Sequence, residues 1–257
     1  MGVQYGVGVD IGSTCAKTVV VDAHKDIVWR DLRPTGWSSV DTAEAIRRDL
    51  SGTVATGGQT RFVATGYGRV SVPFADKCVT EITCHARGAV HLFQADDLNV
   101  IDIGGQDTKI IVIRGGGVSE FVMNDKCSAG TGRFLEVMAN TLAARPGVLC
   151  EMARQGNETR ISSLCTVFAE SEAVNLIGRG TPREDIAWGV VDSIAQKVRT
   201  QAGKLRLGSG PLCLTGGLCD FPFVRERLEA AFGREVRTLP DARFAGALGA
   251  ALTAAAL

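Results

Sequence analysis

Apolar residues in this chain gather into two similar runs, and each run leads into a turn that begins Asp-Ile-Gly. Residues 6–21 read GVGVDIGSTCAKTVVV and residues 98–113 read LNVIDIGGQDTKIIVI. The β-branched residues that follow each turn favour a strand. Neither turn is a P-loop, because a P-loop places Gly-Lys-Ser/Thr at the head of a helix. The pattern therefore predicts the same strand–turn–strand unit twice, which indicates a duplicated molecule with two similar lobes.

The rest of the pattern alternates between strands and helices, as in an α/β protein. Residues 62–65 read as a strand before a glycine turn at 66–68, and residues 211–215 read as a second strand before Gly216-Gly217. Apolar residues return at helical spacing after the loop SAGTG at 128–132, namely Phe134, Leu135, Met138 and Leu142.

Two further helices are expected from their capping residues. Thr181 is followed by Pro182 and Glu184, a capping pattern. It predicts a helix that begins at Thr181 and runs to about Leu205. Asp220 is expected to cap the next helix. The Ala- and Leu-rich end of the chain predicts a buried closing helix. We expect lobe I to comprise residues 1–97 with 240–257, and lobe II to comprise residues 98–239.

Composition narrows the class of partner. The 257 residues carry 28 basic and 28 acidic side chains, so no excess positive charge indicates binding to nucleic acid or to an anionic membrane. The N-terminal stretch has no basic and apolar leader pattern, and no apolar run reaches the roughly 18–20 residues of a spanning helix. We therefore expect a cytoplasmic protein without nucleic-acid or membrane partners.

The two Asp-Ile-Gly turns are candidate phosphate-binding loops. Backbone N–H groups near Gly12, Gly104 and Gly105 can surround phosphate oxygens, and a side chain there would hold the backbone away. Asp10 and Asp102 offer hard oxygen ligands for Mg²⁺ through retained waters and are expected to be catalytic, together with Gln106. Additional groups that can contact phosphate are Ser13, Thr14 and Lys17. The alternative is that each Asp-Gly only forms a tight hairpin turn.

These two turns and the later Thr215-Gly216-Gly217 resemble the phosphate-1, phosphate-2 and adenosine motifs of the superfamily of acetate kinase, hexokinase, Hsp70 and actin. The resemblance implies the two-lobed ASKHA ATPase fold, with lobes of the βββαβα type. It implies ATP or ADP between the lobes, with Gly216 and Gly217 against the adenosine.

Eight cysteines are present, and none forms a CxxC pair. A reducing compartment disfavours disulfides, so most are expected to be small buried apolar residues. Cys127 and Cys165 differ, because each is expected to precede a helix directly, where the dipole stabilises a thiolate. Two thiolates cannot complete a Cys₄ iron–sulfur site in one chain, but two chains related by a two-fold axis could do so. The alternative is a pair of buried structural thiols.

The whole set of motifs resembles the ATPase activators of 2-hydroxyacyl-CoA dehydratases, a family that includes the ATPase subunits of benzoyl-CoA reductase. The motifs are GVDIGSTCAK, ATGYGR at 64–69, VIDIGGQD, NDKCSAGTGRF, CTVFAESE and LTGGL. The resemblance implies that Cys127 and Cys165 ligate one [4Fe-4S] cluster shared across a homodimer. It also implies an oxygen-sensitive reductase that passes one electron from reduced ferredoxin or flavodoxin to a dehydratase, with ATP hydrolysis.

Other functions remain open from the residues alone. The partner could be a benzoyl-CoA-type reductase or another double-cubane enzyme. A small-molecule kinase of the same fold would need a catalytic carboxylate, for which Asp107 and Asp125 are candidates. An actin- or Hsp70-like binding module is a third possibility, although the chain has no separate peptide-binding domain or filament insertions.

Overall fold

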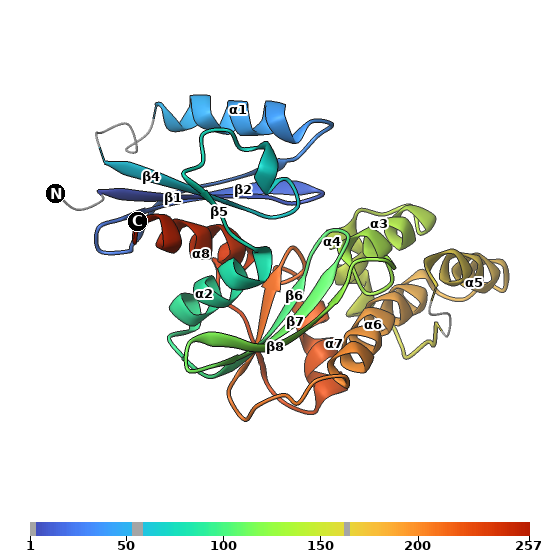
Figure 1. Cartoon of the computed structure of the whole chain (residues 1–257). Coiled ribbons are helices and arrows are strands. Elements are labelled where there is room, and N and C mark those ends of the chain that lie inside the picture. Colours follow the sequence, from blue (N-terminus) through green and yellow to red (C-terminus); the bar gives the residue numbers. More distant parts are fainter. Residues whose placement is uncertain (1–3, 53–58, 162–164) are drawn as a thin grey trace. The chain divides into compact units, whose positions relative to one another are not determined.

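The computed structural model describes residues 4–52, 59–161 and 165–257 (Figure 1). The chain divides into two compact units. Unit 1 runs to Asp97 and includes Ile113–Ser119 and Asp241–Leu257, and unit 2 comprises Leu98–Val112 with Glu120–Pro240. Each unit is built on a five-stranded sheet. Within the described ranges, no helix is both long enough and apolar enough to cross a membrane.

The sheet of unit 1 has the strand order β3-β2-β1-β4-β5. Strand β1 pairs antiparallel with β2, which places Asp10 opposite Lys17. It pairs parallel with β4 on its other edge, which places Asp10 opposite Thr65. The strands span Tyr5–Ile11 (β1), Cys15–Asp22 (β2), Ile27–Pro34 (β3), Thr60–Thr65 (β4) and Lys77–Cys78 (β5). The strands predicted on both sides of the first turn, and the one that ends at Thr65, are confirmed.

Helices cover both faces of this sheet (Figure 1). Helix α1 (Ser39–Leu50) buries Ile46 among the side chains on one face of β1, and α8 (Ala245–Ala254) packs on the opposite face beside α2 (Glu81–Phe93). The predicted closing helix is therefore confirmed. Gly8 makes its close packing possible, because a Cβ there would lie 1.9 Å from the Ala247 carbonyl oxygen of α8.

The sheet of unit 2 has the order β10-β9-β6-β7-β8. Strand β6 pairs parallel with β9, and Asp102 lies opposite Thr215. Each strand therefore has the same neighbours as its counterpart in unit 1, so the duplicated two-lobed α/β fold predicted from the sequence is confirmed. The strands span Leu98–Ile103 (β6), Thr108–Arg114 (β7), Gly117–Asn124 (β8), Leu212–Gly216 (β9) and Val236–Arg237 (β10).

The units differ between their third and fourth strands. Unit 1 has α1 there, whereas unit 2 has α3 (Gly132–Thr141), α4 (Pro146–Ala153), α5 (Thr166–Gly178) and α6 (Arg183–Ala202). Helix α7 (Pro222–Phe232) follows β9, and short 3₁₀ turns cover Arg69–Ser71 and Ala242–Phe244. Cys127 and Cys165 both lie in this enlarged segment of unit 2.

Two predicted helix starts are wrong in detail. Pro182, not Thr181, is the N-cap of α6, which ends at Ala202 rather than near Leu205, and Glu184 and Asp185 supply negative charge in its first turn. Asp220 does not cap α7, because Pro222 takes the first helical position and Phe221 becomes the N-cap.

The third correction concerns the cysteines. Cys165 is the N-cap of α5, as expected. Cys127 does not precede a helix directly, because α3 begins at Gly132 with Thr131 as its N-cap. Gly130, with φ +81°, makes the intervening turn, which separates Cys127 from the helix dipole.

Replacing Gly8 by Ala tests the close packing of β1 on α8. The added methyl group would overlap a backbone carbonyl that cannot rotate away, so we expect the free energy of unfolding to fall by about 3 kcal/mol. Chemical denaturation measures it. Gly117→Ala is the control, because the nearest atom to its new Cβ is the Arg114 carbonyl oxygen at 3.8 Å. Equal stability of both variants would contradict this account.

Candidate functional site

The first candidate phosphate loop lies at the end of β1. Asp10 is 4% exposed, whereas Ser13 and Thr14 are exposed and Gly12 is half-buried. Thr35 fixes the turn, since its hydroxyl donates to the Gly12 carbonyl at 2.7 Å and its N–H donates to the Thr14 carbonyl at 3.0 Å. The loop therefore holds its shape while its polar tip stays accessible to a ligand.

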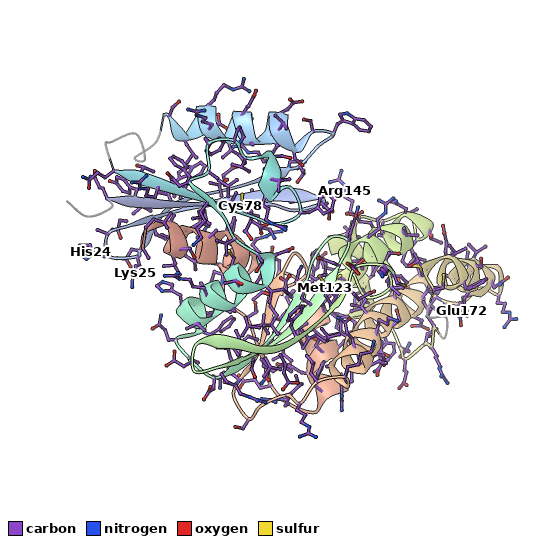
Figure 2. All side chains as sticks on the ribbon, viewed as in Figure 1. His24, Lys25, Cys78, Met123, Arg145 and Glu172 are labelled. Carbon is purple, nitrogen blue, oxygen red and sulfur yellow. The ribbon has the colours of Figure 1, made fainter. Side chains whose placement is uncertain are left out.

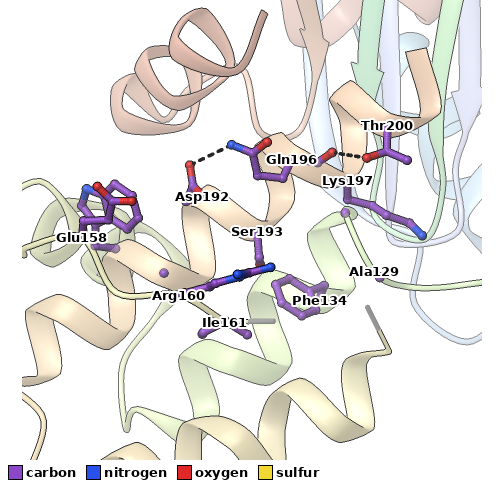
Figure 3. Close-up of a pocket in the computed structure, with 13 residues that line it drawn as sticks. Ala129, Phe134, Glu158, Arg160, Ile161, Asp192, Ser193, Gln196, Lys197 and Thr200 are labelled. Atoms are coloured by element: carbon purple, nitrogen blue, oxygen red, sulfur yellow. Dashed lines mark hydrogen bonds between the residues drawn. The ribbon is translucent and has the colours of Figure 1, made fainter. Parts of the chain in front are cut away.

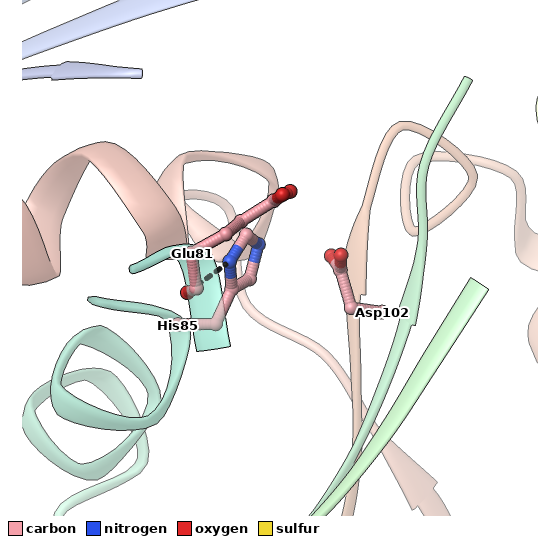
Figure 4. Close-up of side chains that lie close together, drawn as sticks. All are labelled: Glu81, His85 and Asp102. Atoms are coloured by element: carbon pink, nitrogen blue, oxygen red, sulfur yellow. Dashed lines mark hydrogen bonds between the residues drawn. The ribbon is translucent and has the colours of Figure 1, made fainter. Parts of the chain in front are cut away.

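His85 is a site residue of unit 1 that the sequence pattern did not indicate. It lies on α2, 2% exposed, and its Nδ1 is 3.1 Å from the Glu81 carbonyl (Figure 4). A carbonyl only accepts, so Nδ1 carries a proton. A Cβ on Gly246 would lie 2.7 Å from both His85 Cε1 and Asp10 Oδ2, so the ring and the carboxylate border the same point. A lone histidine inside a helix gives no sequence signal for this position.

The second candidate loop, at the end of β6, contains a buried ion cluster. Lys109 Nζ lies 3.2 Å from Asp102 Oδ2 and 2.7 Å from Asp107 Oδ2. The Thr215 hydroxyl donates to Asp102 Oδ1 at 3.0 Å. Lys109 is 1% exposed, and a buried ammonium group requires such partners. The cluster orients the Asp102 carboxylate before any ligand binds.

Lys109 was therefore missed as a site residue, although the repeat placed it in register with Lys17. Lys17 is half-buried, and Cys15 takes the place in unit 1 that Asp107 has in unit 2. The pattern alone could not distinguish the two lysines, because the burial of Lys109 depends on its packing in the folded unit and on its pairing with Asp102 and Asp107. Of the two carboxylates considered for a kinase, Asp107 is paired with Lys109. Asp125 is exposed directly after strand β8, in the loop that leads to Cys127.

The duplication extends beyond the Asp-Ile-Gly turns to strand β4 in unit 1 and strand β9 in unit 2. Gly66 follows Thr65 and Gly216 follows Thr215, and both glycines have φ +85°. A Cβ at Gly216 would lie 2.5 Å from the Ile103 carbonyl oxygen. The N–H of Gly217 donates to that carbonyl at 2.9 Å. The shared Thr-Gly after an apolar strand was the available signal. Gly216 is buried and Gly217 is half-buried at this turn.

The groups of unit 2 expected to contact phosphate are accessible. Gln106 is exposed, and Gly104 and Gly105 are half-buried at the tip of the turn. The Gly104 N–H donates to the Asp107 carbonyl at 2.9 Å, and a Cβ on Gly104 would lie 2.3 Å from Asp107 Oδ1. The turn therefore needs glycine at 104 to fold under the Asp107 side chain.

Cys127 and Cys165 are the cysteines whose segments the structure brings together. Cys127 is half-buried and Cys165 is exposed. The hydroxyl groups of Ser128 and Thr166, each next to one of these cysteines, lie 2.8 Å apart. The Asn124 amide donates to the Cys127 carbonyl at 2.8 Å and shapes the loop further.

The remaining cysteines are poorer candidates for a metal. Cys84, Cys150, Cys213 and Cys219 are buried. Burial raises the pKa of the Cys84 thiol to about 11 and that of the Cys150 and Cys213 thiols to about 12. Protonated thiols are weak ligands. Cys78 is exposed on the short strand β5 of unit 1 (Figure 2), and Cys15 is half-buried in the first phosphate loop.

A pocket of about 480 Å³ in unit 2 borders the loop that follows Cys127 (Figure 3). Ala129 and Gly130 form part of its wall, and Lys197 of α6 lies against Gly130. Asp192, also in the wall, is paired with Arg227 at 2.7 Å. The other lining residues include Phe134, Arg160 and Trp188. The cysteine loop is thus packed on α6 at one point and flanked by open space elsewhere.

Replacing Lys109 by Met tests the ion cluster. The variant leaves two carboxylates without their shared cation, so we expect the free energy of unfolding to fall by about 3–5 kcal/mol. Lys17→Met is the matched control at the repeated position, and its half-buried side chain should contribute less than about 1 kcal/mol. Denaturant titrations of the two variants measure the difference. A small loss in Lys109→Met would contradict the structural role assigned to the cluster.

Comparison with known proteins extends the description. The model of the BadF/BadG/BcrA/BcrD ATPase family matches residues 7–254. The (R)-2-hydroxyglutaryl-CoA dehydratase activating ATPase of Acidaminococcus fermentans is 41% identical over 253 residues, covering 97% of this chain and 96% of that protein. One of the subunits of benzoyl-CoA reductase from Thauera aromatica is 28% identical over 257 residues, covering 95% of this chain and 91% of that protein.

Solved structures of dehydratase activators are similar to this chain over nearly its full length. The crystal structure of component A of the A. fermentans dehydratase has a TM-score of 0.91 at 39% identity, covering 98% of both chains. The activator of 2-hydroxyisocaproyl-CoA dehydratase from Clostridium difficile with bound ADPNP has a TM-score of 0.90 at 34% identity, covering 98% of this chain and 94% of that one.

More distant structures share the fold alone, such as a ROK-family glucokinase from Streptomyces griseus at 16% identity, with a TM-score of 0.62 and 97% and 99% coverage. A family match over nearly the full length, together with both phosphate turns and the paired cysteine segments, settles the family: the chain belongs to the BadF/BadG/BcrA/BcrD ATPases.

Proposed function

We propose that this protein is an ATP-dependent one-electron reductase that activates a 2-hydroxyacyl-CoA dehydratase. The observation that carries the proposal is the connection of two unlike sites within unit 2. The ordered turn at Asp102 is built for phosphate, and the segments of Cys127 and Cys165 meet through Ser128 and Thr166. Full-length similarity to an activating ATPase supports the same activity.

The ATPase part of the proposal uses the two glycine turns. Asp10 and Asp102 are the residues that would hold Mg²⁺ through waters, and the contacts of Thr215 and Lys109 with the Asp102 oxygens would favour such an indirect contact. Gln106 and Asp102 position the attacking water. The phosphates lie against the accessible turn groups Gly12, Ser13, Thr14, Lys17, Gly104 and Gly105. The adenosine lies against Gly216 and Gly217.

The two cysteines fit half of an iron–sulfur site. Cys127 and Cys165 are more accessible than the thiols whose pKa burial raises, and their loops are fastened together. A [4Fe-4S] cluster takes four thiolates, so a second copy of the chain supplies the other two. Such a cluster, when bound, accepts and donates a single electron at low potential. This chain would position the two thiolates through the Asn124 contact to the Cys127 backbone and the contact between Ser128 and Thr166.

Helix α5 supports a homodimer. Its side chains Val167, Phe168, Val174 and Ile177 are exposed, although all four are apolar. Only Ala169 and Ala173 of this helix are buried among the described residues. Exposed apolar side chains beside Cys165 mark an interaction surface. A second copy would cover this surface and complete the ligand set at the same time.

The electron donor in this proposal is reduced ferredoxin or flavodoxin, and the acceptor is a 2-hydroxyacyl-CoA dehydratase. The similarity to a component of the T. aromatica benzoyl-CoA reductase keeps a reductase of that type as a second candidate acceptor. Purified dehydratase and benzoyl-CoA-type reductase, each supplied with reductant and ATP, distinguish the two. A small-molecule kinase is a third candidate, and of its two possible carboxylates Asp107 is paired with Lys109 and Asp125 is exposed.

Replacing Cys127 by Ala tests the ligand assignment. Wild-type protein, purified without oxygen, should carry about two irons and two sulfides per chain, which corresponds to one shared cluster. Cys127→Ala should lose this iron while it retains nucleotide binding, because Asp10 and Asp102 are untouched. Cys78→Ala is the control, since Cys78 is exposed but lies in unit 1. Full iron content in Cys127→Ala would overturn the assignment.

Replacing Phe168 by Asp tests the dimer. Phe168 is 67% exposed, so the substitution leaves the fold of one chain intact but places a charge on the proposed contact surface. Sedimentation should give the mass of two chains for the wild type and of one for Phe168→Asp. Phe121→Asp, at a 51% exposed phenylalanine on β8, should remain dimeric. A dimer that tolerates Phe168→Asp would contradict this surface.

A further inference from the structure

The turn after β6 is attached directly to helix α3. The N–H of Gly132 donates to the Gly104 carbonyl at 2.9 Å, and the N–H of Arg133 donates to the Gly105 carbonyl at 2.7 Å. These are the first N–H groups of α3, which have no acceptor within the helix. Thr131 does not cap them, because its hydroxyl donates to the Ser128 carbonyl at 2.6 Å. The glycine turn therefore serves as the N-terminal cap of α3.

Peptide geometry makes this attachment sensitive to a ligand. In a planar trans peptide, the C=O and the following N–H point in opposite directions. The Gly104 carbonyl and the Gly105 N–H belong to one such plane, and the Gly105 carbonyl and the Gln106 N–H belong to the next. The carbonyl oxygens of both planes accept the hydrogen bonds from α3. The N–H sides therefore face away from α3, and a phosphate that accepts from them pulls on the same planes that hold the start of α3.

The loop between Cys127 and α3 is fastened to the same strand. We name residues 128–132 the coupling loop. The Thr108 hydroxyl, 1% exposed at the start of β7, donates to the Gly130 carbonyl at 2.6 Å. Gln201 of α6 fixes Thr108 in turn by donating to its carbonyl at 2.9 Å. The first residue after the phosphate turn on β7 thus holds the middle of the coupling loop.

The coupling loop also reaches the second cysteine. Ser128 at its start contacts the hydroxyl of Thr166, the first residue of α5 and the neighbour of Cys165. Gly132 at its end packs tightly on the turn, because a Cβ there would lie 3.1 Å from the Gly104 carbonyl oxygen and 3.3 Å from Gly105 Cα, closer than an ordinary van der Waals contact. The coupling loop is therefore hydrogen-bonded at its start, its middle and its end.

We propose that the coupling loop transmits the occupancy of the phosphate turn at Gly104–Gln106 to Cys127 and Cys165, with Thr108 as the positioning residue that joins the two sites. This inference rests on the proposed function in one respect, namely that the turn binds a nucleotide phosphate. It adds which groups carry the signal: two backbone carbonyls, the Thr108 hydroxyl and the Ser128–Thr166 pair.

The test measures alkylation of the cysteines in iron-free protein, so it does not depend on electron transfer. Iodoacetamide modification of the peptides that carry Cys127 and Cys165 is followed by mass spectrometry, with and without a saturating, non-hydrolysable Mg²⁺–ATP analogue. Exposed Cys78 in unit 1 serves as an internal reference. In the wild type we expect the analogue to change both rates relative to Cys78 by about fivefold or more, the low end of typical coupling between sites.

Thr108→Val keeps the shape of the side chain but removes the hydrogen bond to Gly130. We expect the analogue to bind, as shown by titration, while the rate ratio falls to about one. Thr200→Val is the control, because the Thr200 hydroxyl donates only along its own helix, to the Gln196 carbonyl at 2.9 Å. It should behave as the wild type. A ratio in Thr108→Val equal to that of the wild type would overturn the inference.

Gly132→Ala provides a second variant that removes no hydrogen-bonding side chain. Its methyl group would push the turn away from α3, so the rate ratio should fall here as well. A wild-type protein that binds the analogue without any change in either cysteine also overturns the inference. Failure of the wild type to bind the analogue would instead contradict the proposed ATPase site.

Discussion

The carboxylate of Asp102 has each of its oxygens bound, and the candidate site of unit 2 depends on this arrangement. Thr215 reaches one oxygen because β6 and β9 pair in parallel with these two residues opposite each other. Lys109 reaches the other oxygen from β7 and also binds Asp107, whose side chain lies over Gly104. Strands β6, β7 and β9 therefore meet at the buried Asp102 carboxylate, and these contacts shape the glycine turn.

Much of this arrangement could be predicted from the sequence. The repeat of Asp-Ile-Gly and Lys indicated both strand–turn–strand units and the duplicated fold, because continuous apolar runs and β-branched residues are local signals. The position of Cys165 at the start of α5 was also predicted correctly. These features depend on residues that are close in sequence.

The remainder depends on contacts between distant segments. Nothing near Lys109 in the sequence shows that it is buried whereas Lys17 is not, and nothing near His85 shows that it borders Asp10. The caps at Thr181 and Asp220 were mistaken because a proline fixes the backbone where each helix begins, at the N-cap of α6 and at the first helical position of α7. Cys127 was placed too close to a helix because the Gly130 turn intervenes.

Each unit connects its glycine turn to the helix that follows, but the connection differs between the two units. In unit 1 the Gly12 carbonyl is held by the Thr35 hydroxyl, and the Thr35 carbonyl accepts from Thr42 of α1 at 2.6 Å, so a side chain stands between turn and helix. In unit 2 the helix itself donates to the turn. Two backbone hydrogen bonds, from Gly132 and Arg133, join turn and helix directly there. Under the coupling proposed above, a change in the turn would reach Cys127 through these two bonds and through the one from Thr108. Cys84 and Cys213, by contrast, lie buried in the cores of their units.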